Sequence, residues 1–456
     1  MQFCKFFSHR LALPTLALFL VCPRISGQSQ SSVTNHEALK DYVLQKDDSF
    51  AWKQTEKKQI DGLTVFRLQC TSQTWRGNPW QHNMLVVRPA EARNPDIAFL
   101  LISGDGNVDR NLDLLRLLAV RAGSAAAVIN KVPNQPLFRG RKEDALIAFT
   151  FDQFVKTGDT SWPLLFPMVK SAVRGLDTVQ ALAQKEFGDK VERFVVSGAS
   201  KRGWTTWLTG AVDTRVKAIA PMVIDMLNMK AQTQWAAKMY GGQSEKIEDY
   251  TQYDFDKRLD EPRMVELRNW VDPYSYLERY KIPKLLLLGT NDPYWVVDSL
   301  RHYWADLPEP KLVFQTPNAG HDLGGGREAR QTLAAFFQMI ADRQPLPSMS
   351  WQFQTNSTNV EVDVSLTQQA KTFRLWTANS PDRDFRNDHW SSTVLTSNAP
   401  HALAKIAPAA AGYRAYMVEA ELTASTGHNF KLSTEARVTP DGRPSTSASG
   451  NGEKAN

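Results

Sequence analysis

The sequence predicts an α/β fold in which a mostly parallel sheet is covered by helices on both faces. Residues 164–187 carry apolar side chains at every third or fourth position, which is typical of an amphipathic helix. The apolar run 191–196 then predicts a buried strand, followed by a glycine-bearing turn and a helix to Gly210. We also expect strands at 216–224, 284–288 and 312–315, and a closing helix at 327–340. Strands that alternate with helices in this way form parallel sheets buried on both faces.

The first third of the chain predicts an antiparallel start to this sheet. Turn-forming residues separate the early strands, as in the segments Gly77-Asn78-Pro79 and Arg93-Asn94-Pro95. Because short turns connect antiparallel neighbours, the first strands should pair with one another directly. We expect a short helix at 37–44 and strands at 63–68, 84–88, 97–103 and 126–129.

Changes in composition divide the chain into regions. Residues 225–280 interrupt the strand pattern with a segment rich in Trp, Tyr and Met, and we expect this segment to form a lid over the carboxyl ends of the strands. The last residues are rich in Ser, Gly and Lys, which predicts disorder. The expected regions are a signal peptide at 1–27, an α/β domain at 36–344, a small β-rich C-terminal domain at 345–443 and a disordered tail at 444–456.

The N-terminus predicts export. The basic residues Lys5 and Arg10 precede an apolar run from Leu11 to Cys22. This run is long enough for a signal peptide but too short for a membrane span, which needs about 20 apolar residues. We therefore expect a secreted or periplasmic protein with no stable membrane span after processing; an uncleaved anchor is the alternative. Processing would leave Cys70 as the sole cysteine, which predicts a buried small residue and no internal disulfide.

Charge and motifs exclude several classes of function. The formal net charge is +6, and removal of Lys5, Arg10 and Arg24 with the signal peptide would reduce it to +3. This charge is too small, and too evenly spread, to indicate binding to nucleic acid or to an anionic membrane. The sequence contains no zinc-ligand spacing, phosphate loop or dinucleotide fingerprint, so we expect neither a metal nor a cofactor.

Ser200 is the best candidate nucleophile. It lies in Gly198-Ala199-Ser200, between a predicted strand and a predicted helix. A sharp turn there would lift the hydroxyl off the sheet edge, and the helix dipole would favour negative charge beside it. The segment departs from the pattern Gly-x-Ser-x-Gly, because Arg202 stands where the second glycine is expected and the glycine comes one place later. A strand-to-helix turn with no catalytic role is the alternative for this segment alone.

Two further residues follow predicted core strands. Asp292 comes after the strand at 284–288, and His321 follows the strand at 312–315 through a glycine-bearing loop. The carboxylate could orient the imidazole, which could then take the proton of the serine. Alone, Asp292 could be a turn former and His321 a surface loop residue. Placed after three successive sheet strands, Ser200, Asp292 and His321 have the chain order of α/β-hydrolases, and we predict that they form a catalytic triad.

Acyl transfer also needs donors for the oxyanion. One would be the backbone N–H of Lys201. The second is expected from the loop Gly104-Asp105-Gly106, whose glycines allow the backbone to turn its N–H groups inward. A tight turn without a ligand is the alternative for this loop. The Lys201 side chain could add positive charge at the oxyanion, select an anionic substrate, or form a salt bridge to the lid.

Aromatic residues lie beside the predicted catalytic positions. Trp204 follows Ser200 by four residues, and Tyr294 and Trp295 follow Asp292. Aromatic side chains at the mouth of a site line many acyl and sugar pockets, so we predict that these three bind substrate. Packing in the core is the alternative for each of them.

Five long segments carry a further signal: 72–77 with Trp80 and His82, then 132–137, 141–148, 167–174 and 198–207. These segments resemble the PhoPQ-activated pathogenicity-related proteins. The resemblance runs from about residue 37 to the C-terminal β region, and it implies an exported α/β-hydrolase-like fold with a Ser-Asp-His arrangement. Members of that family are tied to virulence regulation in bacteria. The nucleophile segment is also similar to that of glucuronoyl esterases, which suggests ester chemistry by analogy.

These observations together predict an exported serine hydrolase. We expect an esterase that forms an acyl-enzyme and acts on a small-molecule or glycan ester. A peptidase of the same fold is one alternative. A non-catalytic binding or signalling protein on a hydrolase scaffold is the other. The sequence indicates neither the particular substrate nor the oligomeric state.

Overall fold

The computed structural model describes residues 37–355 and 359–441. The expected signal peptide at 1–27 and the expected tail at 444–456 lie outside the described residues. From Glu37 onward the described residues belong to one compact unit. None of the helices in this part of the chain is long and apolar enough to cross a membrane.

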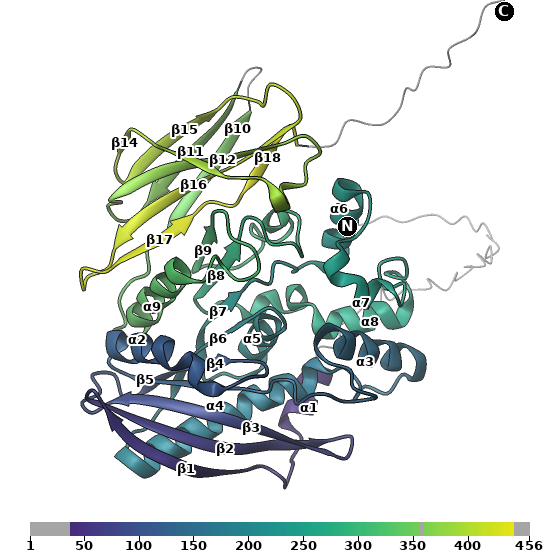
Figure 1. Cartoon of the computed structure of the whole chain (residues 1–456), viewed down its shortest axis with the longest axis vertical. Coiled ribbons are helices and arrows are strands. Elements are labelled where there is room, and N and C mark those ends of the chain that lie inside the picture. The colour runs from purple at the N-terminus through teal and green to yellow at the C-terminus, as the bar shows by residue number, and fades with distance from the viewer. Residues whose placement is uncertain (1–36, 356–358, 442–456) are drawn as a thin grey trace, which may run out of the picture. The chain divides into compact units, whose positions relative to one another are not determined.

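The main sheet has nine strands in the order β1-β2-β3-β5-β4-β6-β7-β8-β9 (Figure 1). The four strands β1, β2, β3 and β5 pair antiparallel, and from β5 to β9 every pair is parallel. The predicted antiparallel start and parallel continuation are therefore confirmed. The strands are β1 (Ala51–Ile60), β2 (Leu63–Trp75), β3 (Asn78–Pro89), β4 (Ile97–Ile102), β5 (Ala125–Ile129), β6 (Arg193–Ala199), β7 (Val216–Met222), β8 (Lys284–Gly289) and β9 (Lys311–Thr316).

Side-chain alternation along the strands divides the interior into two cores. In β4, Ala98, Leu100 and Ile102 belong to the core on one face, whereas Phe99 and Leu101 belong to the core on the other. Successive side chains of a strand point to opposite faces, so a strand that is apolar at every position must be covered on both sides. This explains why β4 is an unbroken run of buried residues.

The helices cover these two faces. Residues of α1, α3, α4, α5 and α8 join the first core, and residues of α2 and α9 join the second. The helices are α1 (Glu37–Leu44), α2 (Leu112–Ala122), α3 (Glu143–Thr157), α4 (Leu165–Phe187), α5 (Lys201–Val212) and α9 (Arg327–Ala341). The lid segment between β7 and β8 contains α6 (Met229–Tyr240), η2 (Glu245–Ile247), α7 (Glu248–Thr251), α8 (Pro262–Val271) and η3 (Pro273–Arg279).

The topology places a crevice at the carboxyl ends of β4 and β6. From β4 the chain passes through α2 to β5 on one side, and then returns through α3 and α4 to β6 on the other side. The connections that follow these two adjacent strands run in opposite directions and over opposite faces of the sheet. This creates a crevice beyond the carboxyl ends of the strands, which is where α/β proteins bind their ligands. The loop after β4 and the turn after β6 both lie there.

The C-terminal β region forms two antiparallel sheets. One has the order β10-β11-β15-β14; the other contains β13-β12-β16-β17, with β18 paired to β16. Its apolar residues, such as Val362 and Val418, share one core with Phe336 of α9. The strands are β10 (Met349–Thr355), β11 (Val360–Leu366), β12 (Thr372–Ser380), β13 (Ser391–Val394), β14 (Ser397–Asn398), β15 (His401–Ile406), β16 (Tyr413–Thr423), β17 (Asn429–Ser433) and β18 (Arg437–Thr439).

Outside the lid segment, one strand and two α-helices of the main domain were not expected from the sequence: β1, α2 and α3. The strand β1 contains no buried residue, because it is an edge strand held by backbone pairing with β2. Helix α3 is buried over most of its surface and so lacks the polar face that identifies an amphipathic helix. Helix α2 is the other helix that was not expected from the sequence.

Candidate active site

Ser200 occupies a strained turn between β6 and α5. Its backbone has φ 59° and ψ −127°, a conformation that residues with a Cβ atom rarely adopt. The N–H of Ser200 donates to the carbonyl oxygen of Met222 at 2.9 Å, which ties the turn to the end of β7. Strained backbone of this kind persists where the surrounding structure enforces it, and it often marks functional residues. The turn has the form of a nucleophile elbow.

Two glycines make this turn possible. A Cβ atom on Gly198 would lie 2.6 Å from the carbonyl oxygen of Arg202, and one on Gly203 would lie 2.7 Å from the Cγ2 atom of Ile224. Both distances are shorter than van der Waals contact, so only glycine fits. Gly203, which stands one place later than the second glycine of Gly-x-Ser-x-Gly, is therefore required because α5 packs closely on β7 and on Ile224.

His321 and Asp292 lie side by side at the carboxyl ends of β9 and β8. The Nδ1 atom of His321 is 2.8 Å from Oδ2 of Asp292. The Oδ1 atom of Asp292 accepts a hydrogen bond from the N–H of Tyr294 at 3.0 Å, and the carboxylate is buried. This leaves Nε2 of His321 as the ring nitrogen that faces away from the carboxylate. Within the described part of the chain Nε2 is buried and has no hydrogen-bond partner.

Ser200 and His321 line the same cavity, which has a volume of about 720 Å³. They are not hydrogen-bonded to each other in residues 37–355 and 359–441. Catalytic hydrogen bonds are often long before substrate binds and tighten in the complex. The structure therefore brings the three predicted residues to one edge of the sheet, with the His–Asp contact formed and the Ser–His contact open.

One detail of the predicted arrangement is wrong. Ser200 follows β6, Asp292 follows β8 and His321 follows β9, so the three strands are not successive in the sheet. Strand β7 lies between β6 and β8. The apolar run 216–224 predicts strand β7, but nothing in the sequence assigns a residue at its end to the site. The structure places the buried carboxyl of Asp225 just beyond this strand.

The loop predicted to supply the second oxyanion donor lies beside Ser200. Gly104 and Asp105 line the same cavity as Ser200 and His321. The loop is fixed from behind, because the carbonyl oxygen of Gly104 accepts from the N–H of Lys131 at 3.0 Å and that of Gly106 accepts from Nδ2 of Asn130 at 2.7 Å. Lys201 is the first residue of α5, and the N–H groups in the first turn of a helix have no acceptor within that helix.

The Lys201 side chain forms ion pairs with α3. Its Nζ atom lies 2.9 Å from Asp144 and 3.5 Å from Glu143, so the salt bridge to the lid, one of the three alternatives for this side chain, is formed with α3 instead. Burial alone would lower the pKa of Lys201, but the charges of these carboxylates outweigh burial and raise it. Asp144 also accepts a hydrogen bond from the hydroxyl of Tyr250 in the lid segment at 2.9 Å.

Arg202 is a second charged residue whose place the sequence did not reveal. Its guanidinium donates to both carboxylate oxygens of Glu143, at 2.6 and 2.7 Å, and to the carbonyl oxygen of Val132 at 2.5 Å. Burial opposes ionisation of Glu143, yet this bidentate pair outweighs it and lowers the pKa of Glu143 to about 2. Arg202 thus connects the turn at Ser200 to α3 and to the segment after β5. The only sequence signal was its position after Ser200.

The three aromatic residues predicted to bind substrate all line a second cavity. Trp204 and Trp295 form part of its wall together with Ser200. Tyr294 lines it too, and the Tyr294 ring lies 4.4 Å from the His321 ring between centroids, with 31° between the planes. Trp204 is also held by a hydrogen bond from Nε1 to the carbonyl oxygen of Val271 at 2.5 Å.

A second Ser–His contact lies away from this site. The Oγ atom of Ser72 is 2.9 Å from Nε2 of His82, and Nδ1 of His82 is 2.9 Å from the carbonyl oxygen of Asn130. Both side chains are buried, and burial lowers the pKa of His82 to about 4, which keeps the imidazole neutral. A backbone carbonyl stands where a triad has a carboxylate, so this contact joins β2, β3 and the segment after β5 structurally. Cys70, on the same strand as Ser72, is buried and free, as expected.

A strained serine turn at the carboxyl edge of a mostly parallel sheet, with a histidine and a carboxylate after later strands, is the arrangement of an α/β-hydrolase-type fold. The chain belongs to the PhoPQ-activated pathogenicity-related protein family, whose model matches residues 39–386. It is 30% identical to the Autocrine proliferation repressor protein A of Dictyostelium discoideum over 458 residues, which cover 90% of this chain and 92% of that protein.

Solved structures similar to this chain include several esterases. Acetyl xylan esterase 1 from Thermoanaerobacterium sp. JW/SL YS485 has a TM-score of 0.48 and 16% identity, and the match covers 67% of this chain and 92% of the esterase. The S-formylglutathione hydrolase from Agrobacterium tumefaciens has a TM-score of 0.42 and 12% identity, and the match covers 64% of this chain and all of the hydrolase.

Proposed function

We propose that the protein is an exported serine hydrolase that cleaves carboxylic esters through an acyl-enzyme. The observation that supports this most directly is the contact between His321 and Asp292, which leaves Nε2 of His321 buried and unpartnered beside the cavity that Ser200 also lines. Strained backbone and an unpartnered polar atom both recur at functional sites, and here the two line one cavity. Export rests on the N-terminal sequence, through Lys5, Arg10 and the apolar run that follows them.

The reaction follows from these positions. Nε2 of His321 takes the proton of Ser200 as Oγ attacks the ester carbonyl carbon, and the N–H of Lys201 with the loop at Gly104 and Asp105 would stabilise the oxyanion. The C–O bond to the alcohol then breaks, and the proton passes from Nε2 to the leaving oxygen. Water attacks the acyl-serine by the same route, releasing the carboxylic acid and restoring the hydroxyl.

The test compares the full chain with its Ser200→Ala variant. We expect the wild-type protein to hydrolyse 4-nitrophenyl esters and to gain the mass of one fluorophosphonate group, and the variant to do neither while keeping its circular dichroism spectrum. Labelling that persists in the variant would remove Ser200 from the mechanism. Aminoacyl 4-nitroanilides turned over as fast as esters would favour a peptidase. Failure of the folded wild-type protein to label, under conditions that label a control hydrolase, would favour a non-catalytic protein.

A further inference from the structure

Two cavities of different character meet at Ser200. One has a volume of about 170 Å³ and the other about 720 Å³, and both are lined by Ser200 and by Lys201. The smaller cavity lies between the main domain and the lid segment, and the larger one lies beyond the carboxyl ends of β4, β6 and β9. An ester bound for attack has its carbonyl carbon at the serine, so its acyl group and its alcohol extend in different directions. Two cavities that share the nucleophile can receive these two parts.

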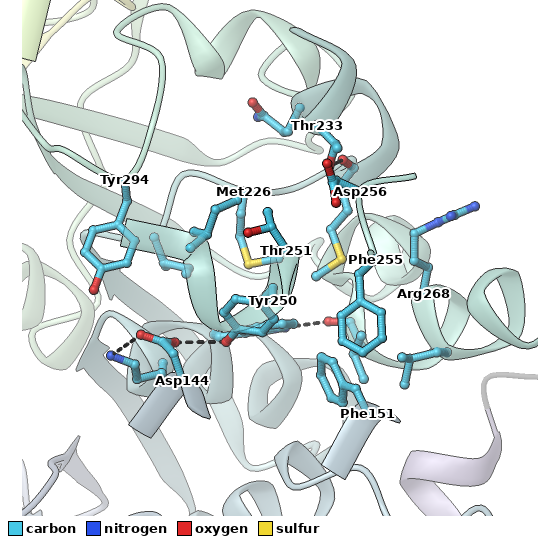
Figure 2. Close-up of a pocket in the computed structure, with 18 of the residues that line it drawn as sticks. Asp144, Phe151, Met226, Thr233, Tyr250, Thr251, Phe255, Asp256, Arg268 and Tyr294 are labelled. Carbon is cyan, nitrogen blue, oxygen red and sulfur yellow. Dashed lines mark hydrogen bonds and ion pairs between the residues drawn. The ribbon is translucent and has the colours of Figure 1, made fainter. Parts of the chain in front are cut away.

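The smaller cavity is apolar over most of its wall. The main domain contributes side chains from α3 and α5, and the lid segment contributes side chains from α6, α8 and the residues between α7 and α8 (Figure 2). Methionines in such a wall adapt to ligands of different shape, because the thioether chain is flexible. Apolar residues of the wall include Phe151, Trp204, Met226, Met229, Phe255 and Leu267.

The position of His321 decides which part of the ester each cavity receives. The leaving oxygen must lie within hydrogen-bond reach of Nε2, because that nitrogen returns the proton to it. His321 lines the larger cavity, together with polar residues such as Asp105 and Arg110, and is not among the residues that line the smaller one in the described part of the chain. The alcohol therefore belongs in the larger, more polar cavity, and the acyl group in the smaller, apolar one.

We propose that the smaller cavity is an acyl pocket that selects an apolar acyl group of about the size of one aromatic ring or a six-carbon chain. This inference rests on the proposed ester hydrolysis and names its substrate class. The size follows from the volume, since an apolar protein cavity of about 150 Å³ binds benzene. Each methylene or ring carbon that leaves water for such a wall adds to the binding of the transition state, whereas an acetyl group fills little of it.

The far end of the cavity sets an upper limit to the acyl group. Figure 2 shows Asp256, Thr233 and Arg268 on the side opposite to Asp144 and Tyr294. An alkyl chain that reached these polar groups would have to displace their water without replacing its hydrogen bonds. The benefit of added carbon atoms should therefore end once the apolar wall is covered.

The experiment measures kcat/KM for 4-nitrophenyl acetate, hexanoate, benzoate and dodecanoate, each divided by the rate of its spontaneous hydrolysis. We expect hexanoate and benzoate to exceed acetate by about tenfold or more, and dodecanoate to give no further gain. Met229→Trp fills the cavity from α6 and should lower the ratio of hexanoate to acetate about tenfold. Met229→Ala enlarges the cavity and should move the optimum to longer chains, which provides a second test if the Trp variant does not fold.

Gln234→Trp is the matched control, because Gln234 is exposed on the same helix and does not line the cavity. It should leave both rates unchanged. Turnover with no dependence on acyl length, or an equal loss for hexanoate and acetate in Met229→Trp, would overturn the acyl pocket and leave the proposed hydrolase intact. No turnover of any ester, with no fluorophosphonate labelling, would overturn both.

Discussion

Asn318 and Trp390 are joined by two hydrogen bonds that connect the loop before His321 to the C-terminal β region. Nδ2 of Asn318 donates to the carbonyl oxygen of Trp390 at 2.8 Å, and the N–H of Trp390 donates to Oδ1 of Asn318 at 2.7 Å. A similar contact holds the other loop, because Nδ2 of Asn291 donates to the carbonyl oxygens of Phe385 and Asp388 at 3.0 and 2.8 Å. The segment 385–390 thus touches the loops that carry both His321 and Asp292.

These contacts predict that Asn318→Gly lowers kcat. Asn318 has φ 56°, which glycine adopts without strain, so the substitution removes the hydrogen bonds and leaves the backbone conformation accessible. We expect kcat to fall about tenfold to a hundredfold with little change in KM, because small displacements of a catalytic group cost rate more than binding. Asp61→Gly replaces another left-handed residue, in the exposed turn between β1 and β2, and should change neither constant. Equal effects of the two substitutions would show that Asn318 does not position the site.

The sequence predicted this site in part. Asp292 and His321 could be identified because each follows a strand whose apolar run is unmistakable, and parallel strands bring their carboxyl ends to one edge. The contact between Asn318 and Trp390 could not be predicted, because it joins segments 72 residues apart that only the packing of the C-terminal β region on the main domain brings together. The partners of Lys201 were missed for a similar reason. Glu143 and Asp144 begin a helix whose register over the sheet no local pattern fixes.

Asp292→Asn should abolish most of the activity while the protein stays folded. The amide can still accept the hydrogen bond from the N–H of Tyr294, but it no longer holds the imidazole of His321 in the tautomer that leaves Nε2 free to accept a proton. We expect kcat to fall by about 10³ to 10⁴ with KM nearly unchanged, measured on a 4-nitrophenyl ester.

Asp322→Asn is the control for this substitution, since Asp322 is exposed beside the histidine and its carboxylate accepts a hydrogen bond from the N–H of Gly324 instead of contacting the imidazole. It should retain most of the wild-type rate. A loss smaller than about tenfold in Asp292→Asn would mean that another carboxylate orients His321, and Asp225 would be the first to examine.

Ser200→Gly should produce a protein more stable than Ser200→Ala, although both are inactive. The backbone at position 200, with φ 59°, costs a residue with a Cβ atom about 1 to 3 kcal/mol, and glycine avoids this cost. The greater freedom of glycine in the unfolded chain offsets part of the gain. Chemical denaturation should therefore give a free energy of unfolding about 1 kcal/mol higher for Ser200→Gly. Equal stabilities would mean that the elbow is not strained.

Asp225 makes the stability of the fold depend on pH. Its carboxyl group is buried beyond the end of β7 and accepts a hydrogen bond of 2.6 Å from the hydroxyl of Tyr303. Burial raises the pKa of Asp225 from 3.8 to about 7, the hydrogen bond opposes this rise, and the nearby charge of Asp292 adds to it. Between pH 4 and 7 the folded chain therefore retains a proton that the unfolded chain releases.

The sign of the effect follows from this difference in proton binding. Because the folded state binds more protons than the unfolded state in this window, the contribution of Asp225 to the free energy of unfolding falls as pH rises from about 4 to about 7, and is constant above that range. A pKa shift of this size corresponds to about 4 kcal/mol at most. Asp225→Asn keeps the acceptor for the hydroxyl of Tyr303 and removes the titrating group. Urea denaturation at pH 5, 6, 7 and 8 should therefore give a free energy of unfolding that depends less on pH than in the wild-type protein and that is higher than the wild-type value at pH 8. Asp363→Asn is the control, because Asp363 lies on the exposed face of β11, and it should keep the wild-type dependence of the free energy of unfolding on pH. If Asp225→Asn also kept the wild-type dependence, the carboxyl of Asp225 would already be ionised in the folded protein at pH 5.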